Sequence, residues 1–313
     1  MSTVFISHPD CLNHITPKNH PERVERLISI MDSLSGLEHP NLIRLEAPLC
    51  KESDIMRAHP KEYLDRIKQA KPTGGFVSLD ADTFMSSGSL SAAMRGIGGI
   101  LRAIDLVMDS KATNGFVATR PPGHHAEKTK PMGFCLFGNV SIATKYILDH
   151  HQLSKVAIVD FDVHHGNGTQ DILWDEARAL FISSHQMPLY PGTGTELETG
   201  VQNNILNLPL SPNSTGKEFR SLYENKVFPL LEDFSPDFIL ISAGFDAHAS
   251  DPLANLNLTE EDFSWVTGRL CDLADKHCDG RLVSTLEGGY DLDALAKSAK
   301  KHLEVLLDRG HNV

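Results

Sequence analysis

Four strongly apolar runs, each ending in a cluster of glycine, aspartate, histidine or tyrosine, constrain the fold of this chain most. The runs are GFVATR (115–120), KVAIVDFD (155–162), DFILISAGFD (237–246) and RLVSTLEGGY (281–290). Short runs that are apolar throughout are typical of strands buried on both faces. Segments with helical spacing alternate with them, as in βαβ units around a mostly parallel sheet. We therefore predict an α/β fold.

Three segments place apolar residues at helical spacing. They run from Leu90 to Met108, from Phe263 to Leu273 and from Leu292 to Leu306, and we expect them to cover the faces of the sheet. No internal repeat, low-complexity tract or long Pro-, Gly- or Ser-rich linker divides the 313 residues. We therefore expect a single domain over residues 1–313.

The charge balance and the hydropathy exclude some partners. The chain has 41 acidic and 29 basic side chains, a formal net charge of −12. Such a charge repels a phosphate backbone at long range, so we expect no nucleic-acid partner, and cationic substrates are the easier partners. No run approaches the roughly 18 apolar residues of a membrane-spanning helix. The first residues lack the features of a secretory signal, so we expect no membrane partner and a cytoplasmic location.

Cysteine usage argues against disulfides and against cysteine-ligated zinc. The five cysteines are odd in number, scattered, and never spaced as CxxC. We predict that they are reduced thiols.

The polar clusters at the ends of the four runs are expected to form one site. In open α/β sheets, ligands bind beyond the carboxyl ends of the strands, where the loops converge. All four clusters lie at such ends.

The cluster DFDVHHGNG carries candidate metal ligands. In an extended backbone, alternate side chains share a face, so Asp160, Asp162 and His164 would converge. Asp246, in the cluster SAGFDAH, could supply a third ligand beside Asp162 and His164. Three protein ligands leave a position for water, which is typical of a catalytic zinc site. The alternative for an isolated Asp-x-His pair is a loop-capping role, and the position of Asp246 favours the metal site.

The cluster RPPGHHAE supplies the adjacent histidines His124 and His125. Histidine titrates near neutrality, so one ring could take a proton from water and pass one to a leaving amine. Asp160 and Asn167 are natural partners to orient the two rings. By itself, such a pair is more often a second metal site or an ordinary surface dipeptide.

The cluster Glu287-Gly288-Gly289-Tyr290 puts a phenol after two glycines that allow a sharp turn. A tyrosine hydroxyl there could donate to a developing oxyanion. A tyrosine packed in a turn is the alternative.

Five motifs, RPPGHHAE, GFCLFGN, DFDVHHGNGTQ, SAGFDAH and LEGGY, occur in this order along nearly the whole chain. Together they resemble the zinc-dependent histone deacetylase family, and its class II members and bacterial deacetylase-like amidohydrolases more than class I. The resemblance implies an arginase-like three-layer α/β sandwich with a central eight-stranded, mostly parallel sheet, forming one catalytic domain. It also implies hydrolysis of an acetyl or similar acyl amide on the lysine side chain of a peptide or protein.

The resemblance further implies roles for individual residues. Zinc would be bound by Asp162, His164 and Asp246. Catalysis would use His124, His125, Asp160, Asn167 and Tyr290, with Tyr290 as oxyanion donor. A structural potassium ion would be bound by Asp160, Ser183 and Ser184 and by the backbone of Asp162 and His164. The substrate passage would be lined by Gly133, Phe134, Tyr190, Leu253 and Gly288.

Two residues bear on the catalytic roles and on the substrate class. Asn167 stands where class I members carry an aspartate, so the division of acid and base roles within the histidine pair stays open. Leu253 stands where polyamine-selective members place a glutamate, which favours an acyl-lysine substrate. The alternatives are an acetylpolyamine or other small-amide amidohydrolase, and a catalytically silent acyl-lysine binding module. Tyr290 and the two histidines argue against the silent module, because binding alone does not require them.

Overall fold

The computed structural model describes residues 2–309. Its centre is an eight-stranded sheet with the strand order β2-β1-β5-β10-β9-β6-β7-β8. The strands are β1 (Thr3–Ser7), β2 (Leu42–Glu46), β5 (Asn114–Val117), β6 (Val156–Asp160), β7 (Ala179–Gln186), β8 (Ile205–Leu210), β9 (Phe238–Ala243) and β10 (Leu282–Leu286). Every neighbouring pair is parallel. The predicted eight-stranded sheet is confirmed, and it is wholly parallel.

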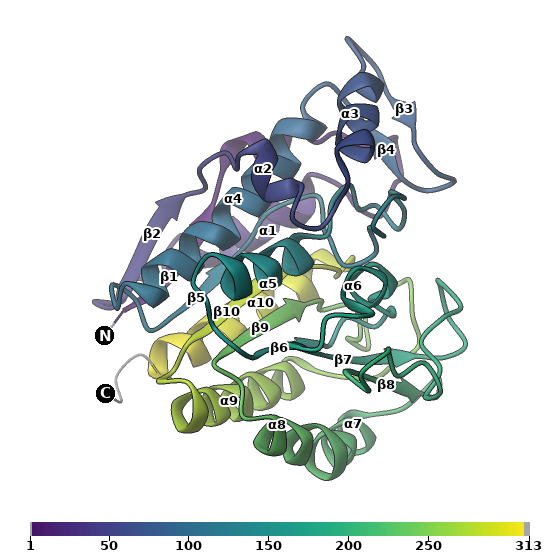
Figure 1. Cartoon of the computed structure of the whole chain (residues 1–313). Coiled ribbons are helices and arrows are strands. Elements are labelled where there is room, and N and C mark those ends of the chain that lie inside the picture. Colours follow the sequence, from purple (N-terminus) through teal and green to yellow (C-terminus); the bar gives the residue numbers. More distant parts are fainter. Residues whose placement is uncertain (1, 310–313) are drawn as a thin grey trace.

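Helices cover both faces of the sheet and complete the three layers (Figure 1). One hydrophobic cluster joins the sheet to α1 (Glu25–Leu34), α7 (Gly216–Leu222), α8 (Phe228–Phe234), α9 (Glu260–His277) and α10 (Leu292–Arg309). A second cluster joins the other face to α2 (Glu52–Ile55), α3 (Lys61–Ala70), α4 (Ser89–Met108), α5 (Asn139–Asp149) and α6 (Asn167–Leu173). The shorter elements are η1 (Pro9–Asn13), η2 (Tyr223–Val227) and the pair β3 (Val77–Ser78) and β4 (Phe84–Met85).

The central strands are apolar throughout because both of their faces are buried. In β6, Ala157 and Val159 pack in one cluster and Val156 and Ile158 in the other. The four predicted strands are confirmed as β5, β6, β9 and β10, and the three predicted helices as α4, α9 and α10. Strands β5, β9 and β10 end before the polar tail of their runs, and β6 ends at Asp160, the first residue of its tail.

The order of the strands brings these polar tails together. Strands β5, β10, β9 and β6 are consecutive in the sheet and parallel. Their carboxyl ends therefore lie side by side at one edge, and the loops that follow them converge there.

All five cysteines are buried and free, in agreement with the predicted thiols. Over residues 2–309, none of the helices combines the length and the apolar character needed to cross a membrane.

Candidate active site

Asp162, His164 and Asp246 form a buried cluster at this edge of the sheet. One ligand atom from each lies within 4.8 Å of the others. The Nδ1 atom of His164 lies 3.1 Å from Asp162 Oδ1 and 3.1 Å from Asp246 Oδ2. Asp162 and His164 follow β6, and Asp246 follows the neighbouring strand β9. The structure thus brings together the three residues that the sequence singled out as metal ligands.

The backbone around Asp162 differs from the prediction. Strand β6 ends at Asp160, and the chain bends at residues 162–164 instead of staying extended. Asp160 Oδ1 accepts a hydrogen bond from the Asp162 N–H at 3.1 Å, and Asp162 Oδ1 accepts one from the His164 N–H at 2.9 Å. Two successive aspartate turns of this kind bend the chain. The predicted extended backbone at residues 160–164 is therefore wrong, although the predicted side chains do converge.

Backbone N–H groups hold the two carboxylates in place. Gly288 donates to Asp162 Oδ2 at 2.7 Å, and Val163 donates to Asp246 Oδ1 at 2.8 Å. A Cβ atom at Gly288 would lie 2.1 Å from Asp246 Oδ2, so only glycine allows this close approach. The structure places Gly288 against the carboxylates.

The electrostatics of this cluster favour a bound cation. Burial opposes the charging of His164, but its hydrogen bonds to Asp162 and Asp246 and their charges outweigh burial and raise its pKa to about 10. Burial and the charge of Asp162 raise the pKa of Asp246 to about 7. Two buried carboxylates beside one imidazole thus attract positive charge.

His124 and His125, in the loop after β5, lie beside the cluster with ring centroids 4.0 Å apart. His124 Nδ1 lies 2.9 Å from Asp160 Oδ2, and its Nε2 lies 3.8 Å from Asp162 Oδ2. His125 Nδ1 lies 2.8 Å from Asn167 Oδ1. Both histidines therefore contact the side chains that the sequence suggested as their partners.

The pKa values of the two histidine rings are shifted in opposite directions. Burial opposes the charging of His124, but the charges of Asp162 and Asp160 outweigh it and raise its pKa well above the usual value. Burial and the positive charges of His124 and His164 hold the pKa of His125 well below the usual value. Of the two rings, His124 therefore holds its proton more strongly, and His125 is the one that more readily stays neutral.

Glu127 fixes how Asn167 faces His125. Asn167 Nδ2 donates to Glu127 Oε1 at 2.8 Å. Because a carboxylate only accepts, the Asn167 carbonyl is the group that faces His125, and it accepts a hydrogen bond from His125 Nδ1. His125 therefore carries its proton on Nδ1 and leaves Nε2 free as an acceptor. Glu127 was not predicted as a site residue, although it belongs to the RPPGHHAE motif.

Tyr290 lies in the loop after β10 and is 7% exposed. The guanidinium of Arg26 lies 4.9 Å from its ring centroid, and the ring of Phe134 meets it edge-on at 5.9 Å. Its N–H donates to Asp251 Oδ2 at 2.7 Å. Among residues 2–309, no side chain or backbone group hydrogen-bonds its hydroxyl. The ring is thus fixed while its hydroxyl stays free for a ligand.

A buried ion network supports the loops that carry Tyr290 and the histidines. Arg120 donates to both carboxylate oxygens of Glu22, at 2.5 and 2.7 Å, and Arg26 donates to Glu22 at 3.1 Å. Arg26 also donates to the carbonyl oxygens of Gly289 and Glu287, at 2.6 and 2.5 Å. All three charged side chains are fully buried. The sequence did not predict this network, because nothing in the local sequence distinguishes a buried charged residue from an exposed one.

Glu287 is another buried carboxyl that was not predicted as a site residue. Its Oε2 accepts hydrogen bonds from the N–H groups of Gly123 and His124, at 2.7 and 3.2 Å. Burial raises its pKa to about 7 against the opposing charge of His124. It ties the loop after β10 to the histidine loop.

Aromatic rings lie between this centre and the surface. Tyr190 meets the His125 ring edge-on at 5.2 Å and is 39% exposed. Phe134 is half-buried and packs at 4.7 Å against His20, another residue missed from the sequence. Gly133 has a φ of +55°, and a Cβ atom there would lie 2.4 Å from the His125 ring. Gly133 therefore lets the loop of Phe134 approach the histidines.

Leu253 is connected to the Tyr290 loop through Asp251, and the two serines lie on β7. Leu253 is half-buried, and its N–H donates to Asp251 Oδ1 at 3.0 Å. Ser183 stands opposite Asp160 in the sheet. The Ser184 hydroxyl lies 3.5 Å from the Asp160 carbonyl oxygen. Both serines thus lie beside Asp160.

Comparisons with known proteins agree with this architecture. Residues 18–306 match the histone deacetylase domain family. The chain is 38% identical over 299 residues to a probable deacetylase of Archaeoglobus fulgidus, covering 94% of this chain and 82% of that protein. It is 38% identical over 274 residues to a histone deacetylase-like amidohydrolase of Pseudomonas aeruginosa, covering 86% and 71%.

A solved structure extends the likeness to three dimensions. The crystal structure of the HDA15 HD domain aligns with a TM-score of 0.92 at 33% identity, covering 98% of this chain and 88% of that chain. The predicted arginase- and deacetylase-like α/β fold is therefore confirmed. The chain belongs to the histone deacetylase family and is a hydrolase of amide bonds.

Proposed function

We propose that residues 1–313 form one catalytic domain that removes an acetyl or similar acyl group from lysine side chains of peptides or proteins, with a bound zinc ion. The observation that carries this proposal is the buried convergence of Asp162, His164 and Asp246 beside His124 and His125. These five side chains supply ligands and proton-transfer groups at one point. A module that only bound acyl-lysine would need neither metal ligands nor proton-transfer groups.

Asp162, His164 and Asp246 would hold the zinc ion. Two carboxylates and an imidazole are ligands that zinc accepts, and three protein ligands leave a position open. When bound, the ion lowers the pKa of water and polarises the amide carbonyl. The hydrogen bonds from Gly288 and Val163 orient the two carboxylates for this task. A set rich in oxygen also accepts iron or cobalt.

A potassium ion would lie behind this centre. Asp160, Ser183 and Ser184 would bind it together with the backbone of Asp162 and His164. The neighbouring positions of Asp160 and Ser183 in adjacent strands support this assignment.

His125 is the general base in this mechanism, and then the general acid. Burial and the charges of His124 and His164 lower its pKa and so favour the neutral ring. Its Nε2 is free because Nδ1 carries the proton that is donated to Asn167. Nε2 accepts the proton of the attacking water and passes it to the nitrogen of the leaving amine. His124, paired with Asp160, stays positive beside the reaction centre and stabilises the negative charge that develops on the substrate.

Tyr290 is the oxyanion donor. Its hydroxyl is without a protein partner among the residues described, and Arg26 and Phe134 fix its ring. A donor that is already in place stabilises the substrate oxyanion without reorganisation.

Phe134 and Tyr190 form the walls of the substrate passage, where aromatic faces pack against the alkyl stem of a lysine. Leu253 near this passage offers no charge to the distant ammonium of a polyamine. An acylated polyamine is the second candidate substrate, favoured by the net charge of −12.

The test compares turnover of acetyl-lysine peptides, longer acyl-lysine peptides and acetylspermidine by zinc-loaded protein, with Tyr290→Phe as the control for contaminating activity. We expect the highest kcat/KM with an acyl-lysine peptide. A higher value with acetylspermidine than with every acyl-lysine peptide would replace the lysine assignment with the polyamine one.

A further inference from the structure

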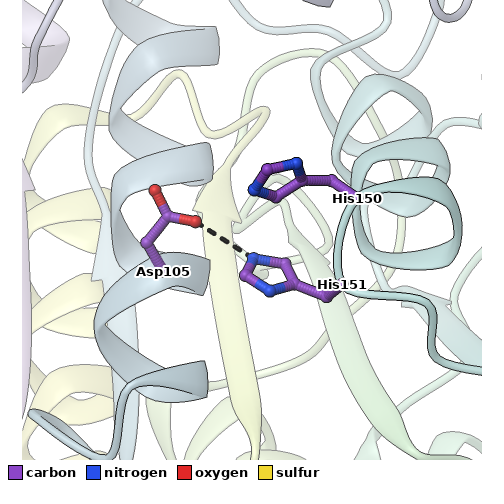
Figure 2. Close-up of side chains that lie close together, drawn as sticks. All are labelled: Asp105, His150 and His151. Carbon is purple, nitrogen blue, oxygen red and sulfur yellow. Dashed lines mark hydrogen bonds and ion pairs between the residues drawn. The ribbon is translucent and has the colours of Figure 1, made fainter.

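A second group of potential metal ligands lies away from the catalytic centre. Asp105 belongs to α4, His150 directly follows α5, and His151 is the next residue. One ligand atom from each lies within 4.8 Å of the others. Figure 2 shows the two imidazole rings side by side, with the Asp105 carboxylate reaching toward them from the neighbouring helix. We propose that these three residues form a second site for a divalent transition-metal ion of the zinc class.

This cluster lies at the opposite edge of the sheet from the catalytic residues. Helix α5 precedes β6, so its carboxyl end lies near the start of that strand, whereas Asp162 and His164 follow its end. Strand β6 has five residues. At about 3.3 Å per residue, the start and the end of this strand lie on the order of 15 Å apart. An ion bound here contacts neither the substrate nor the histidine pair.

The donor set suits zinc and its neighbours. Two imidazoles and one carboxylate are a combination that binds zinc with one position left for water. His151 Nε2 lies 3.0 Å from Asp105 Oδ1, and these side chains are 16% and 35% exposed. An ion can therefore reach them from solvent and take the place of the proton between them.

Tyr146, on α5, positions all three residues. Its hydroxyl donates to Asp105 Oδ1 at 3.0 Å. Its ring stacks on His150 at a centroid distance of 4.6 Å and meets the His151 ring edge-on at 5.3 Å. Groups that orient metal ligands in this way raise the affinity of a site.

The neighbouring charged side chains leave the Asp105 carboxylate available to bind a metal ion. In the part of the chain that the structure describes, no lysine or arginine forms an ion pair with Asp105. Arg57, which lines a neighbouring cavity together with Lys51 and Arg102, lies over the Tyr146 ring at 5.2 Å and 3.9 Å from Asp54. This cavity of about 340 Å³ opens beside His150 and Asp105 and gives room for water ligands.

A second histidine–carboxylate pair provides the matched comparison. His277 Nε2 lies 2.7 Å from Glu232 Oε2, and the His277 side chain is 14% exposed, close to the value for His151. The same oxygen already accepts from Lys276 at 2.6 Å. Beside the His277–Glu232 pair there is thus a lysine ammonium, where the proposed site has its third metal ligand.

The experiment measures zinc and cobalt(II) binding by the full chain, free of any histidine tag, in a His164→Ala background that removes a ligand of the proposed catalytic ion. Equilibrium dialysis gives the stoichiometry, and the visible absorption of cobalt(II) reports its coordination. We expect one ion per chain in this background and none after a further His151→Ala or Asp105→Asn change. His277→Ala should leave binding unchanged, and Tyr146→Phe should weaken it about tenfold or more.

The outcomes separate this site from the catalytic one. In otherwise unaltered protein, His151→Ala should lose one ion per chain and keep its turnover, because the cluster lies away from the reaction centre. Metal should also raise the melting temperature of His164→Ala protein more than that of the His164→Ala/His151→Ala protein. Equal binding by His151→Ala and His277→Ala proteins in the His164→Ala background, or no binding by His164→Ala protein, would overturn the proposal.

Discussion

His125 Nδ1 donates to Asn167 Oδ1 across 2.8 Å. Glu127 holds the Asn167 amide in this orientation through its own hydrogen bond. A neutral amide therefore orients His125, at the position where class I members of the family carry an aspartate. Burial and the positive charges of His124 and His164 keep the pKa of His125 low, against the opposing effect of the hydrogen bond to Asn167. That bond places the proton on Nδ1 and leaves Nε2 free.

A carboxylate in place of this amide should change the pH dependence of catalysis. In the double variant Asn167→Asp/Glu127→Gln, the new carboxylate would favour the charged imidazolium and raise the pKa of His125. Because the base is inactive when protonated, the acidic limb of the kcat/KM profile should move to higher pH. The single variant Glu127→Gln, which adds no charge, is the control. An acidic limb that stayed in place in the double variant would show that His125 is not the base.

Replacing Tyr290 with phenylalanine should keep the fold and the bound metal and lower kcat. The hydroxyl is the only group removed, and loss of one oxyanion donor typically costs about a hundredfold or more. Stopped assays at saturating acetyl-lysine peptide, together with metal analysis, check both parts. Unchanged kcat would leave Tyr290 as a tyrosine packed in its turn.

Replacing Asp246 with asparagine should remove the catalytic ion. Asp246 is fully buried beside His164, and an amide is a weaker ligand than a carboxylate. In a His151→Ala background, which isolates this site, the zinc content should fall from one ion per chain to none. Tyr290→Phe protein in the same background should retain its zinc. Full turnover by the Asp246→Asn variant would disprove the proposed ligand set.

Introducing glutamate at position 253 should shift the substrate preference. A carboxylate there would attract the ammonium of an acetylpolyamine by about 1 kcal/mol or more, which is roughly fivefold in the ratio of kcat/KM values. Leu253→Gln controls for the change of shape and polarity. The idea fails if Leu253→Glu and Leu253→Gln give the same ratio for acetylspermidine and acetyl-lysine peptide.

The buried Glu22 should make stability depend on pH. Burial opposes its charging, but Arg120, His14 and Arg26 outweigh burial and hold its pKa well below the usual range. A carboxyl whose pKa is lower in the folded state stabilises the fold above its unfolded-state pKa, and this contribution is lost as the pH falls toward the folded-state pKa. Glu22→Gln leaves two buried arginines without their counter-charge and should cost about 3–5 kcal/mol at neutral pH.

Urea unfolding at neutral and acidic pH measures this cost. The gap in unfolding free energy between unaltered and Glu22→Gln protein should shrink as the pH falls. Glu261→Gln removes an exposed carboxylate that lies 3.0 Å from Lys301, and it should cost little at either pH. A gap that did not depend on pH would contradict the ionised state of Glu22.

The sequence determined the elements that form the core. Strands β5, β6, β9 and β10 could be recognised because their residues are buried on both faces and must be apolar throughout. Helices α4, α9 and α10 could be recognised because one face of each packs on the sheet and sets an apolar period. The polar tails after these strands also marked the candidate site, because ligands of parallel sheets gather at the carboxyl ends.

The tertiary structure alone decided which distant groups meet. Glu22 and Arg120 are 98 residues apart in sequence, and Asp105 and His151 are 46 apart. No local pattern encodes such pairs, because burial and charge pairing arise only when strand order and helix packing bring the segments together. The orientation of Asn167 is also such a property, since Glu127 sets it from a different loop. The local sequence thus specifies the strands, the helices and the types of chemical group, while non-local packing specifies which groups are buried, charged and in contact.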